Sequence, residues 1–323
     1  MHIYTPPIDP KLMGKLYSLW TQAFGEDEDP DISAETLTSD GPEGKELNLF
    51  CALQEEELAA TAISIISSNL PELGAVGEVA TDLAYRNQGM ASKLCRKLLG
   101  HFKHNDGKVL FLGTINPKAA RIYQRLGWNH IPKTKLMVNM VGGTNYCDYL
   151  GDYYEDLSLY QIRPANYESR IPIIPLFTSP NEWQVLDVNV PIYSINSVPL
   201  SSCLGINRRY NYLKKYGRGN WFTAETRNGK IIGISSCALI EEASYLVDGF
   251  CHNNYTSVFK ELLSITVNWS RGKNARNTIM RLSDTDENKL NFVEDLGYTN
   301  PRRGQPFKYG DQNVNSIEYD INQ

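Results

Sequence analysis

The ten residues YRNQGMASKL (85–94) decide the fold that we expect for this chain. They place Arg86 and Gly89 directly before a run whose apolar residues recur at three-to-four spacing, which predicts a helix with one buried stripe. The apolar stripe consists of Ala91, Leu94, Leu98 and Phe102. The first-turn amides of a helix have no partner within the helix and carry partial positive charge. Because Gly89 and Ala91 are small, the stretch predicts a helix start that is open to an anion.

The residues around this stretch indicate a mixed sheet flanked by helices. In chain order we expect a helix (14–24), a hairpin (49–65), a strand (74–85), the helix above, a strand (108–114), a short helix (116–128) and a closing strand (135–141). The short helix has clear end signals, since Asn116 suits the N-cap, Pro117 the first turn and Gly127 a left-handed stop.

The same plan recurs about 170 residues later, which suggests duplication of one fold. The second copy has a hairpin (221–239), a strand (244–250), a long helix (255–272), a strand (278–283) and a capped short helix (286–298). We therefore predict an α/β protein with two tandem domains, each a central mixed sheet flanked by helices. The expected boundaries are 1–145 for the first domain, 146–156 for an aromatic-rich connector and 157–323 for the second domain.

Composition excludes several classes of protein. The chain has 323 residues, enough for two domains, and its net charge of −5 argues against non-specific binding to nucleic acid. No apolar run reaches the roughly 20 residues that cross a bilayer, and the N-terminus does not read as a secretion signal. The six cysteines have no metal-ligand spacing, so we expect reduced thiols, no metal site and a cytoplasmic protein. The oligomeric state is left open.

Two separated motifs in the first copy resemble those of the GCN5-related N-acetyltransferase (GNAT) family. Arg86-x-x-Gly89-x-Ala91 is similar to the family's Q/R-x-x-G-x-G/A loop. Asn116-x-x-Ala119-x-x-x-Tyr123-x-x-x-Gly127-Trp128 is similar to its N-x-x-A-x-x-x-Y-x-x-x-G-F pattern. The resemblance covers residues 14–141 and implies a fold that binds acetyl-coenzyme A, with the pyrophosphate on the open helix start and no metal.

The resemblance also implies a set of cofactor-binding residues. The main chain of 79–81 would contact the acetyl end, one amide polarising the thioester carbonyl, and amides from about 87 to 92 would bind the pyrophosphate. The implied residues are Val79, Ala80, Thr81, Arg86, Asn87, Gln88, Gly89, Met90, Ala91, Ser92, Asn116, Ala119 and Tyr123.

Two catalytic residues are predicted, an acid and a base. By resemblance Tyr123 would protonate the departing thiolate, although a purely structural core aromatic would also suit this position. Glu78 is the first candidate for the general base, Asp82 is the second, and a water chain could replace both. Strand alternation places Glu78 and Asp82 on the face opposite Val79 and Thr81, unless a bulge intervenes.

The second copy departs from the family pattern. Asp286 and Val293 stand where the asparagine and tyrosine are expected, so this copy is predicted to have lost its cofactor site. The acidic run 25–31 could favour a cationic substrate if it lines a cleft. The tandem layout is most similar to self-resistance acetyltransferases for amine-bearing antibiotics of the zwittermicin, edeine and paenilamicin kind. The expected acceptor is therefore a small, polycationic amine; the alternatives are a protein amine acceptor or a non-catalytic acyl-CoA sensor.

Overall fold

The computed structural model describes residues 1–25, 30–155 and 159–321, and its chain forms two compact units. Unit 1 consists of Met1–Tyr149, Arg170–Pro172 and Ser201–Arg208. Unit 2 consists of Leu150–Ser169, Ile173–Leu200 and Arg209–Gln323. Two short segments from the second half of the chain thus belong to unit 1. Residues 26–29, most of the acidic run, lie outside the described residues.

Unit 1 is built on a seven-stranded mixed sheet in the order β1-β2-β3-β4-β5-β7-β6. All neighbours are antiparallel except β4 and β5, which run parallel. The strands are β1 (His2–Tyr4), β2 (Leu47–Gln54), β3 (Glu57–Ile66), β4 (Leu73–Thr81), β5 (Val109–Gly113), β6 (Trp128–His130) and β7 (Leu136–Met140). The helices are α1 (Pro10–Phe24), α2 (Ala34–Thr38), α3 (Pro42–Lys45), a 3₁₀ turn η1 (Leu83–Tyr85), α4 (Met90–His104) and α5 (Pro117–Arg125).

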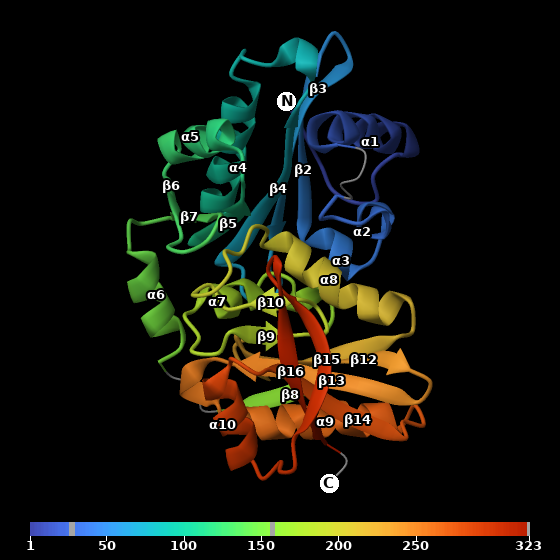
Figure 1. Cartoon of the computed structure of the whole chain (residues 1–323). Coiled ribbons are helices and arrows are strands. Elements are labelled where there is room, and N and C mark those ends of the chain that lie inside the picture. The colour runs from blue at the N-terminus through green and yellow to red at the C-terminus, as the bar shows by residue number, and fades with distance from the viewer. Residues whose placement is uncertain (26–29, 156–158, 322–323) are drawn as a thin grey trace. The chain divides into compact units, whose positions relative to one another are not determined.

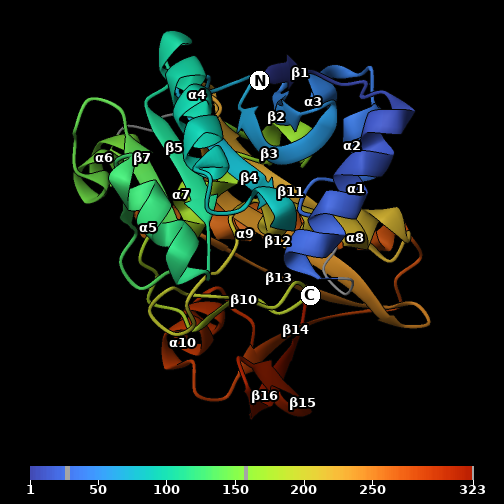
Figure 2. The same ribbon diagram turned by 90° about the horizontal axis from the view of Figure 1, so that it is seen from above.

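Helices cover both faces of the unit 1 sheet, as Figures 1 and 2 show. The helices α4 and α5 pack on one face, where Leu94, Leu98 and Phe102 join Tyr123 and Trp128 in one core cluster. The helix α1 lies on the opposite face and buries Leu16, Leu19 and Trp20. Three residues of the predicted stripe therefore form the α4 side of this core, whereas the fourth, Ala91, is half-buried.

Unit 2 repeats the topology of unit 1. Its seven strands follow the order β8-β11-β12-β13-β14-β16-β15, and again only the central pair, β13 and β14, is parallel. The strands are β8 (Tyr160–Pro164), β11 (Gly219–Thr226), β12 (Ile231–Glu241), β13 (Ser244–Cys251), β14 (Asn277–Ser283), β15 (Arg302–Tyr309) and β16 (Gln312–Asp320). The helix α9 (Val258–Arg271) packs against β12 and β13, and α10 (Glu287–Asp295) follows β14. The expected fold class, two mixed sheets with flanking helices, is confirmed.

Several elements were not expected from the sequence. They include β1, α2, α3, β6 and β8, the helix α6 (Tyr146–Tyr153), the 3₁₀ turn η2 (Tyr167–Ser169), α7 (Ile173–Thr178), β9 (Val185–Asp187), β10 (Ile192–Tyr193), α8 (Leu204–Lys215), the 3₁₀ turn η3 (Asn253–Tyr255) and the β15–β16 hairpin. Most are short and lack a clear period, so that tertiary contacts rather than local pattern decide their conformation. One of them, β9, pairs only with β10 in a separate two-stranded sheet.

Candidate active site

The parallel strands β4 and β5 of unit 1 separate to form a fork. They pair from Leu73–Val109 to Val76–Leu112, after which β4 continues to Thr81 without β5. A bulge lies at the same point, because Glu78 and Val79 both stand opposite the single residue Ala62 of β3. Glu78 has a φ of 48°, a left-handed conformation that is uncommon for a residue with a side chain. A bulge of this kind re-aims side chains and interrupts the ladder, so the fork is irregular where the acetyl contact is predicted.

The bulge is fixed by a short chain of hydrogen bonds from α1. The Trp20 indole donates to the Thr61 hydroxyl at 3.0 Å, and that hydroxyl donates to the main-chain oxygen of Glu78 at 2.9 Å. Both Trp20 and Thr61 are buried, so these bonds are shielded from water. The conformation of Glu78 is thus held by neighbours on two other elements.

The Glu78 carboxylate lies on the α1 side of the sheet and is 8% exposed. One of its oxygens, Oε1, accepts a hydrogen bond from the Asp31 amide at 2.8 Å, in the loop that precedes α2. Burial, followed by the charge of Asp31, raises the pKa of Glu78 to about 7, although hydrogen bonds and Arg208 oppose the rise. A carboxylate with this pKa can take up a proton near neutral pH, as a general base must.

The other candidate base, Asp82, serves a local role. Its carboxylate accepts from the Ala84 amide at 2.8 Å and caps the turn η1. This side chain is therefore used to begin η1, and the geometry favours Glu78 as the base.

Residues 201–208 border the fork on the side away from α4. A β-carbon at Gly113 would lie 2.7 Å from the Ser201 carbonyl oxygen, so only glycine permits this approach. The Ser202 hydroxyl donates to the Asp31 carboxylate at 2.8 Å, and the Arg208 guanidinium donates to the Pro30 carbonyl at 2.7 Å. Sequence reasoning missed Asp31, Ser202 and Arg208, because nothing local marks residues that meet Glu78 only through tertiary structure.

The start of α4 is open, as the sequence predicted. Gly89 is the N-cap residue with a φ of 75°, and no side chain caps the helix. A β-carbon at Gly89 would meet no atom within 4 Å, and the first turn contains no acidic residue. Arg86 turns back so that its Nε donates to the Thr81 carbonyl at 3.1 Å, and it thereby ties the loop to the end of β4. These features fit a diphosphate group, whose charge the exposed amides would match.

The helix α5 supplies the remaining predicted residues. The Asn116 side chain caps α5 by accepting from the Lys118 and Ala119 amides at 2.9 and 3.4 Å. Tyr123 is 6% exposed, and the centroid of its ring lies 6.1 Å from that of Trp128 in a tilted arrangement. Its hydroxyl has no hydrogen-bond partner within the described part of the chain. Burial raises the pKa of Tyr123 well above its usual range, so that the hydroxyl stays protonated as a proton donor must.

The structure thus places the predicted residues on two sides of the fork. Val79, Ala119 and Tyr123 belong to the core on the α4 side. Glu78 contacts Asp31 on the opposite side. The candidate acid and the candidate base consequently lie on opposite faces of the unit 1 sheet.

Residues 13–128 match the model described as the Acetyltransferase (GNAT) family. Similar solved structures include the ribosomal-protein-S5-alanine acetyltransferase from Vibrio fischeri, with 15% identity over 51% of this chain and 93% of that chain and a TM-score of 0.38. Another is Escherichia coli ElaA, with 23% identity over 41% of this chain and 92% of that chain and a TM-score of 0.34.

A third similar structure is the GNAT superfamily phosphinothricin acetyltransferase from Sinorhizobium meliloti in complex with AcCoA. It shares 14% identity over 50% of this chain and 88% of that chain, with a TM-score of 0.37. None of the curated proteins compared with this sequence matches it. Within the described residues, no group of three or more His, Cys, Asp or Glu side chains could hold a metal ion. The described helices include none that is long and apolar enough to cross a membrane.

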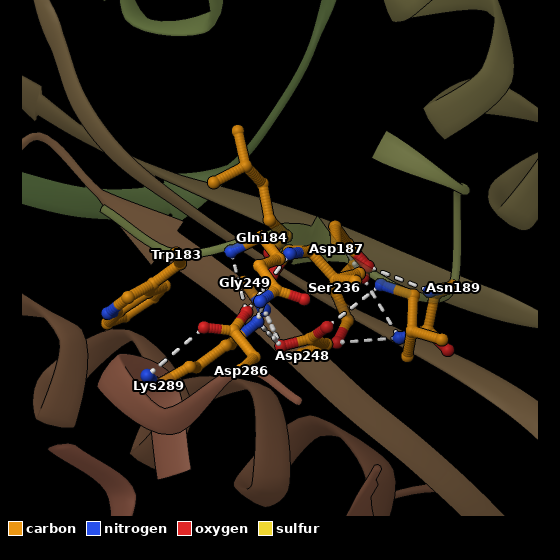
Figure 3. Close-up of polar contacts among 12 residues, drawn as sticks. Trp183, Gln184, Asp187, Asn189, Ser236, Asp248, Gly249, Asp286 and Lys289 are labelled. Atoms are coloured by element: carbon orange, nitrogen blue, oxygen red, sulfur yellow. Dashed lines mark hydrogen bonds and ion pairs between the residues drawn. The ribbon is translucent and has the colours of Figure 1, made fainter. Parts of the chain in front are cut away.

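Unit 2 has the same fork as unit 1, but the chain itself fills it. The strands β13 and β14 pair only from Ser244–Asn277 to Leu246–Ile279, and β9 lies against the unpaired end of β13. The strand β13 has no bulge at this point, since it pairs with β12 without a break from Leu239 to Gly233. Figure 3 shows the side chains of Asp248, Asp286 and Lys289 gathered against the segment 184–189.

Each side chain of this cluster bonds the main chain of the filling segment. The Asp286 carboxylate accepts from the Gln184 and Val185 amides at 2.7 and 3.1 Å. The Lys289 ammonium donates to the Val185 carbonyl at 2.8 Å, and Asp248 accepts from the Val188 amide at 2.8 Å. Main chain of the segment 184–189 therefore lies where β13 and β14 have separated.

Ionisable side chains are buried in and beside this cluster. Lys289 pairs with Asp248 at 2.7 Å, and the two side chains are 1% and 0% exposed. Asp187 is fully buried beside them and accepts from the Ser236 and Tyr210 hydroxyls at 2.6 and 2.9 Å. Burial and the nearby Asp248 raise the pKa of Asp187 above its usual range. The two carboxylates therefore share the single cation Lys289 among the described residues.

We expect Lys289→Met to destabilise unit 2 by about 3–5 kcal/mol, because it leaves Asp248 buried without its partner. Denaturant unfolding of the whole chain measures the change. Lys260→Met, on the exposed face of α9, is the matched control and should have little effect. A loss below about 1 kcal/mol for Lys289→Met would show that the pair is not needed.

Proposed function

We propose that this protein is an N-acetyltransferase that moves the acetyl group of acetyl-CoA to a primary amine of a small cationic molecule. The observation that carries the proposal is the bulged fork of unit 1, with the Glu78 carboxyl group on one side and the protonated Tyr123 hydroxyl on the other. The open start of α4, next to this fork, supports a diphosphate site.

The residues that would hold acetyl-CoA are those that surround the fork and the start of α4. Amides of residues 87–92 would bind the pyrophosphate, and Arg86 would add positive charge. The main chain of Val79–Thr81 would contact the acetyl end, with Asn116 and Ala119 along the bound arm. When bound, acetyl-CoA supplies an acetyl thioester. A main-chain amide at the bulge would polarise its carbonyl, and one such donor contributes roughly 3 kcal/mol.

Two side chains would move protons. Ionised Glu78 would accept a proton from the acceptor ammonium, since only the neutral amine is nucleophilic. The Tyr123 hydroxyl would donate a proton to the leaving sulfur, because it is protonated and has no partner within the described residues. No metal and no covalent enzyme intermediate are required; orientation of both reactants supplies most of the rate.

The side of the fork on which Glu78 contacts Asp31, here called the acceptor side, favours a cationic substrate. Glu78 and Asp31 place two carboxyl groups together, and Arg208 is the basic residue that acts on Glu78. An amine with several positive charges would be attracted to this site. We extend the proposal to a cytoplasmic self-resistance enzyme that acetylates an amine-bearing antibiotic, which agrees with the tandem layout of the chain.

Release of free thiol from acetyl-CoA tests the proposal. The acceptors are spermidine, spermine, a primary amine of similar length that carries a single positive charge, and a peptide with a free N-terminus. We expect turnover with the polyamines and little with the singly charged amine. Turnover with the peptide alone would favour a protein acceptor, and binding of acetyl-CoA without any turnover would favour a sensor.

Tyr123→Phe is expected to lower kcat by about 10²-fold or more, since it removes only the hydroxyl that would donate the proton. The Michaelis constant for acetyl-CoA should change little, because the ring still fills the core beside Trp128. Steady-state kinetics at saturating polyamine measure both values. An unchanged kcat would leave Tyr123 as a structural core residue, and Tyr149→Phe is the control for loss of a tyrosine hydroxyl elsewhere in unit 1.

A further inference from the structure

Asp31 contacts Glu78 in a way that the proposed function does not yet use. Its amide donates to Glu78 Oε1, and its own carboxylate accepts from the Ser202 hydroxyl at 2.8 Å. The preceding residue, Pro30, accepts from the Arg208 guanidinium. Ser202 and Arg208 thus donate hydrogen bonds to the loop that precedes α2, and this loop in turn donates one to Glu78.

We propose that Asp31 is a positioning residue for acetyl transfer: its amide fixes the Glu78 carboxylate, and its negative charge makes Glu78 a stronger proton acceptor. The proposal rests on the proposed function, in which Glu78 takes the proton of the acceptor. It assigns a role in the reaction to residues 201–208, because Ser202 fixes the Asp31 carboxylate near Glu78.

The groups that act on Glu78 come from two elements. Asp31 belongs to the loop before α2 and raises the pKa of Glu78, whereas Arg208 belongs to α8 and lowers it. Cys203 also lies near Asp31, but burial raises the pKa of its thiol to about 12, so it stays neutral. On β3 the contact is Thr61, which does not titrate. Among the described residues, the proton affinity of Glu78 is therefore set by burial and by two opposing charges.

Titration of the Glu78 carboxyl group tests the proposal without a substrate. In protein labelled with ¹³C at the glutamate side-chain carboxyl carbon, the Glu78 signal is identified by its loss in Glu78→Gln. We expect a midpoint near pH 7 in the unaltered protein. Asp31→Asn should lower the midpoint by about one unit or more, and Arg208→Gln should raise it by a similar amount. Asp31→Asn keeps an oxygen that can accept from the Ser202 hydroxyl, and Arg208→Gln keeps an amide donor on a shorter side chain.

Because the Glu78 midpoint is expected to move in opposite directions in the two variants, the experiment distinguishes an effect of charge from an effect of a loosened site. If either substitution merely admitted water, the Glu78 midpoint would fall in both variants, and the proposal would be overturned. An unchanged midpoint in Asp31→Asn would overturn it as well. Asp40→Asn, at an exposed position in unit 1, is the control and should leave the midpoint unchanged.

Kinetics separate failure of this inference from failure of the proposed function. With spermidine as acceptor, the pH at which kcat/KM reaches half of its plateau should move with the Glu78 midpoint in Asp31→Asn. If Glu78→Gln keeps full turnover, Glu78 is not the base and the proposed mechanism fails. If Glu78→Gln loses turnover but the Asp31→Asn profile stays in place, only the role of Asp31 fails.

Discussion

Glu78→Gln is expected to reduce kcat/KM by about 10²- to 10⁴-fold, the range that a general base contributes. The amide keeps the size of the side chain and can still accept from the Asp31 amide. In the unaltered protein, activity should rise with pH through about 7, because the ionised form of Glu78 is the active one. The variant should lack this rise. Rates measured from pH 5.5 to 9 with a polyamine acceptor show both effects.

The same substitution should raise stability at alkaline pH. The pKa of Glu78 is about 7 in the folded chain against an ordinary value of 4.5, so the folded state holds this proton more tightly. Its contribution is complete below about pH 4.5 and is lost as pH rises through 7, a change of up to about 3 kcal/mol. Glu78→Gln removes this loss and should unfold at higher denaturant than the unaltered protein at pH 8.

Loss of activity together with gain of stability would separate a chemical role from misfolding. Glu55→Gln, in the exposed turn between β2 and β3, should change neither quantity. If Glu78→Gln were less stable at pH 8 and showed the same pH profile as the unaltered protein, the assignment of Glu78 would be wrong.

Ser92→Glu has the second large expected effect, on cofactor affinity. A carboxylate in the first turn of α4 interacts favourably with the helix dipole and should keep or raise stability by about 0.3–1 kcal/mol. The same charge would repel a diphosphate on the neighbouring amides and should weaken binding of CoA by about 10- to 100-fold. Isothermal titration calorimetry and thermal unfolding measure the two changes.

Ser92→Gln is the matched control, because it has the same shape without the charge. We expect its affinity for CoA to lie close to that of the unaltered protein. Equal weakening in both variants would point to blocked space rather than charge, and unaltered affinity in Ser92→Glu would exclude a diphosphate at this helix start.

The parts of the site that depend on local chemistry were predictable from the sequence. The left-handed Gly89 before α4 and the Asn116 cap of α5 each involve residues within four positions of one another. Their backbone and capping preferences can therefore be predicted from the local sequence. The repeated order of strands and helices was predictable for the same reason, because the spacing of apolar residues within each segment indicates whether it forms a strand or a helix.

The acceptor side of the site could not be predicted in this way. Ser202 lies 171 positions from Asp31, and Asp31 lies 47 positions from Glu78, so no periodicity or spacing connects them. The bulge at Glu78 was foreseen only as an exception to strand alternation, because it is fixed by Thr61 and Trp20 on other elements. Tertiary contacts decide this part of the molecule.

The second fork illustrates the same limit. The replacement of the family's asparagine and tyrosine by Asp286 and Val293 predicted that phosphate would not bind there. It did not indicate that Asp286 would accept two amides of the segment 184–189, about 100 residues earlier in the chain. The residue that replaces a cofactor-binding asparagine, Asp286, thus binds the main chain of another segment of the same protein.

The central claim is that unit 1 alone binds acetyl-CoA, with its diphosphate on the exposed amides at the start of α4. A crystal structure of the protein with CoA tests it most directly. We predict one CoA per chain, with the diphosphate against residues 87–92, the arm between β4 and β5, and the fork of unit 2 still filled by 184–189. A diphosphate bound elsewhere, or a CoA in place of the segment 184–189, would contradict the account.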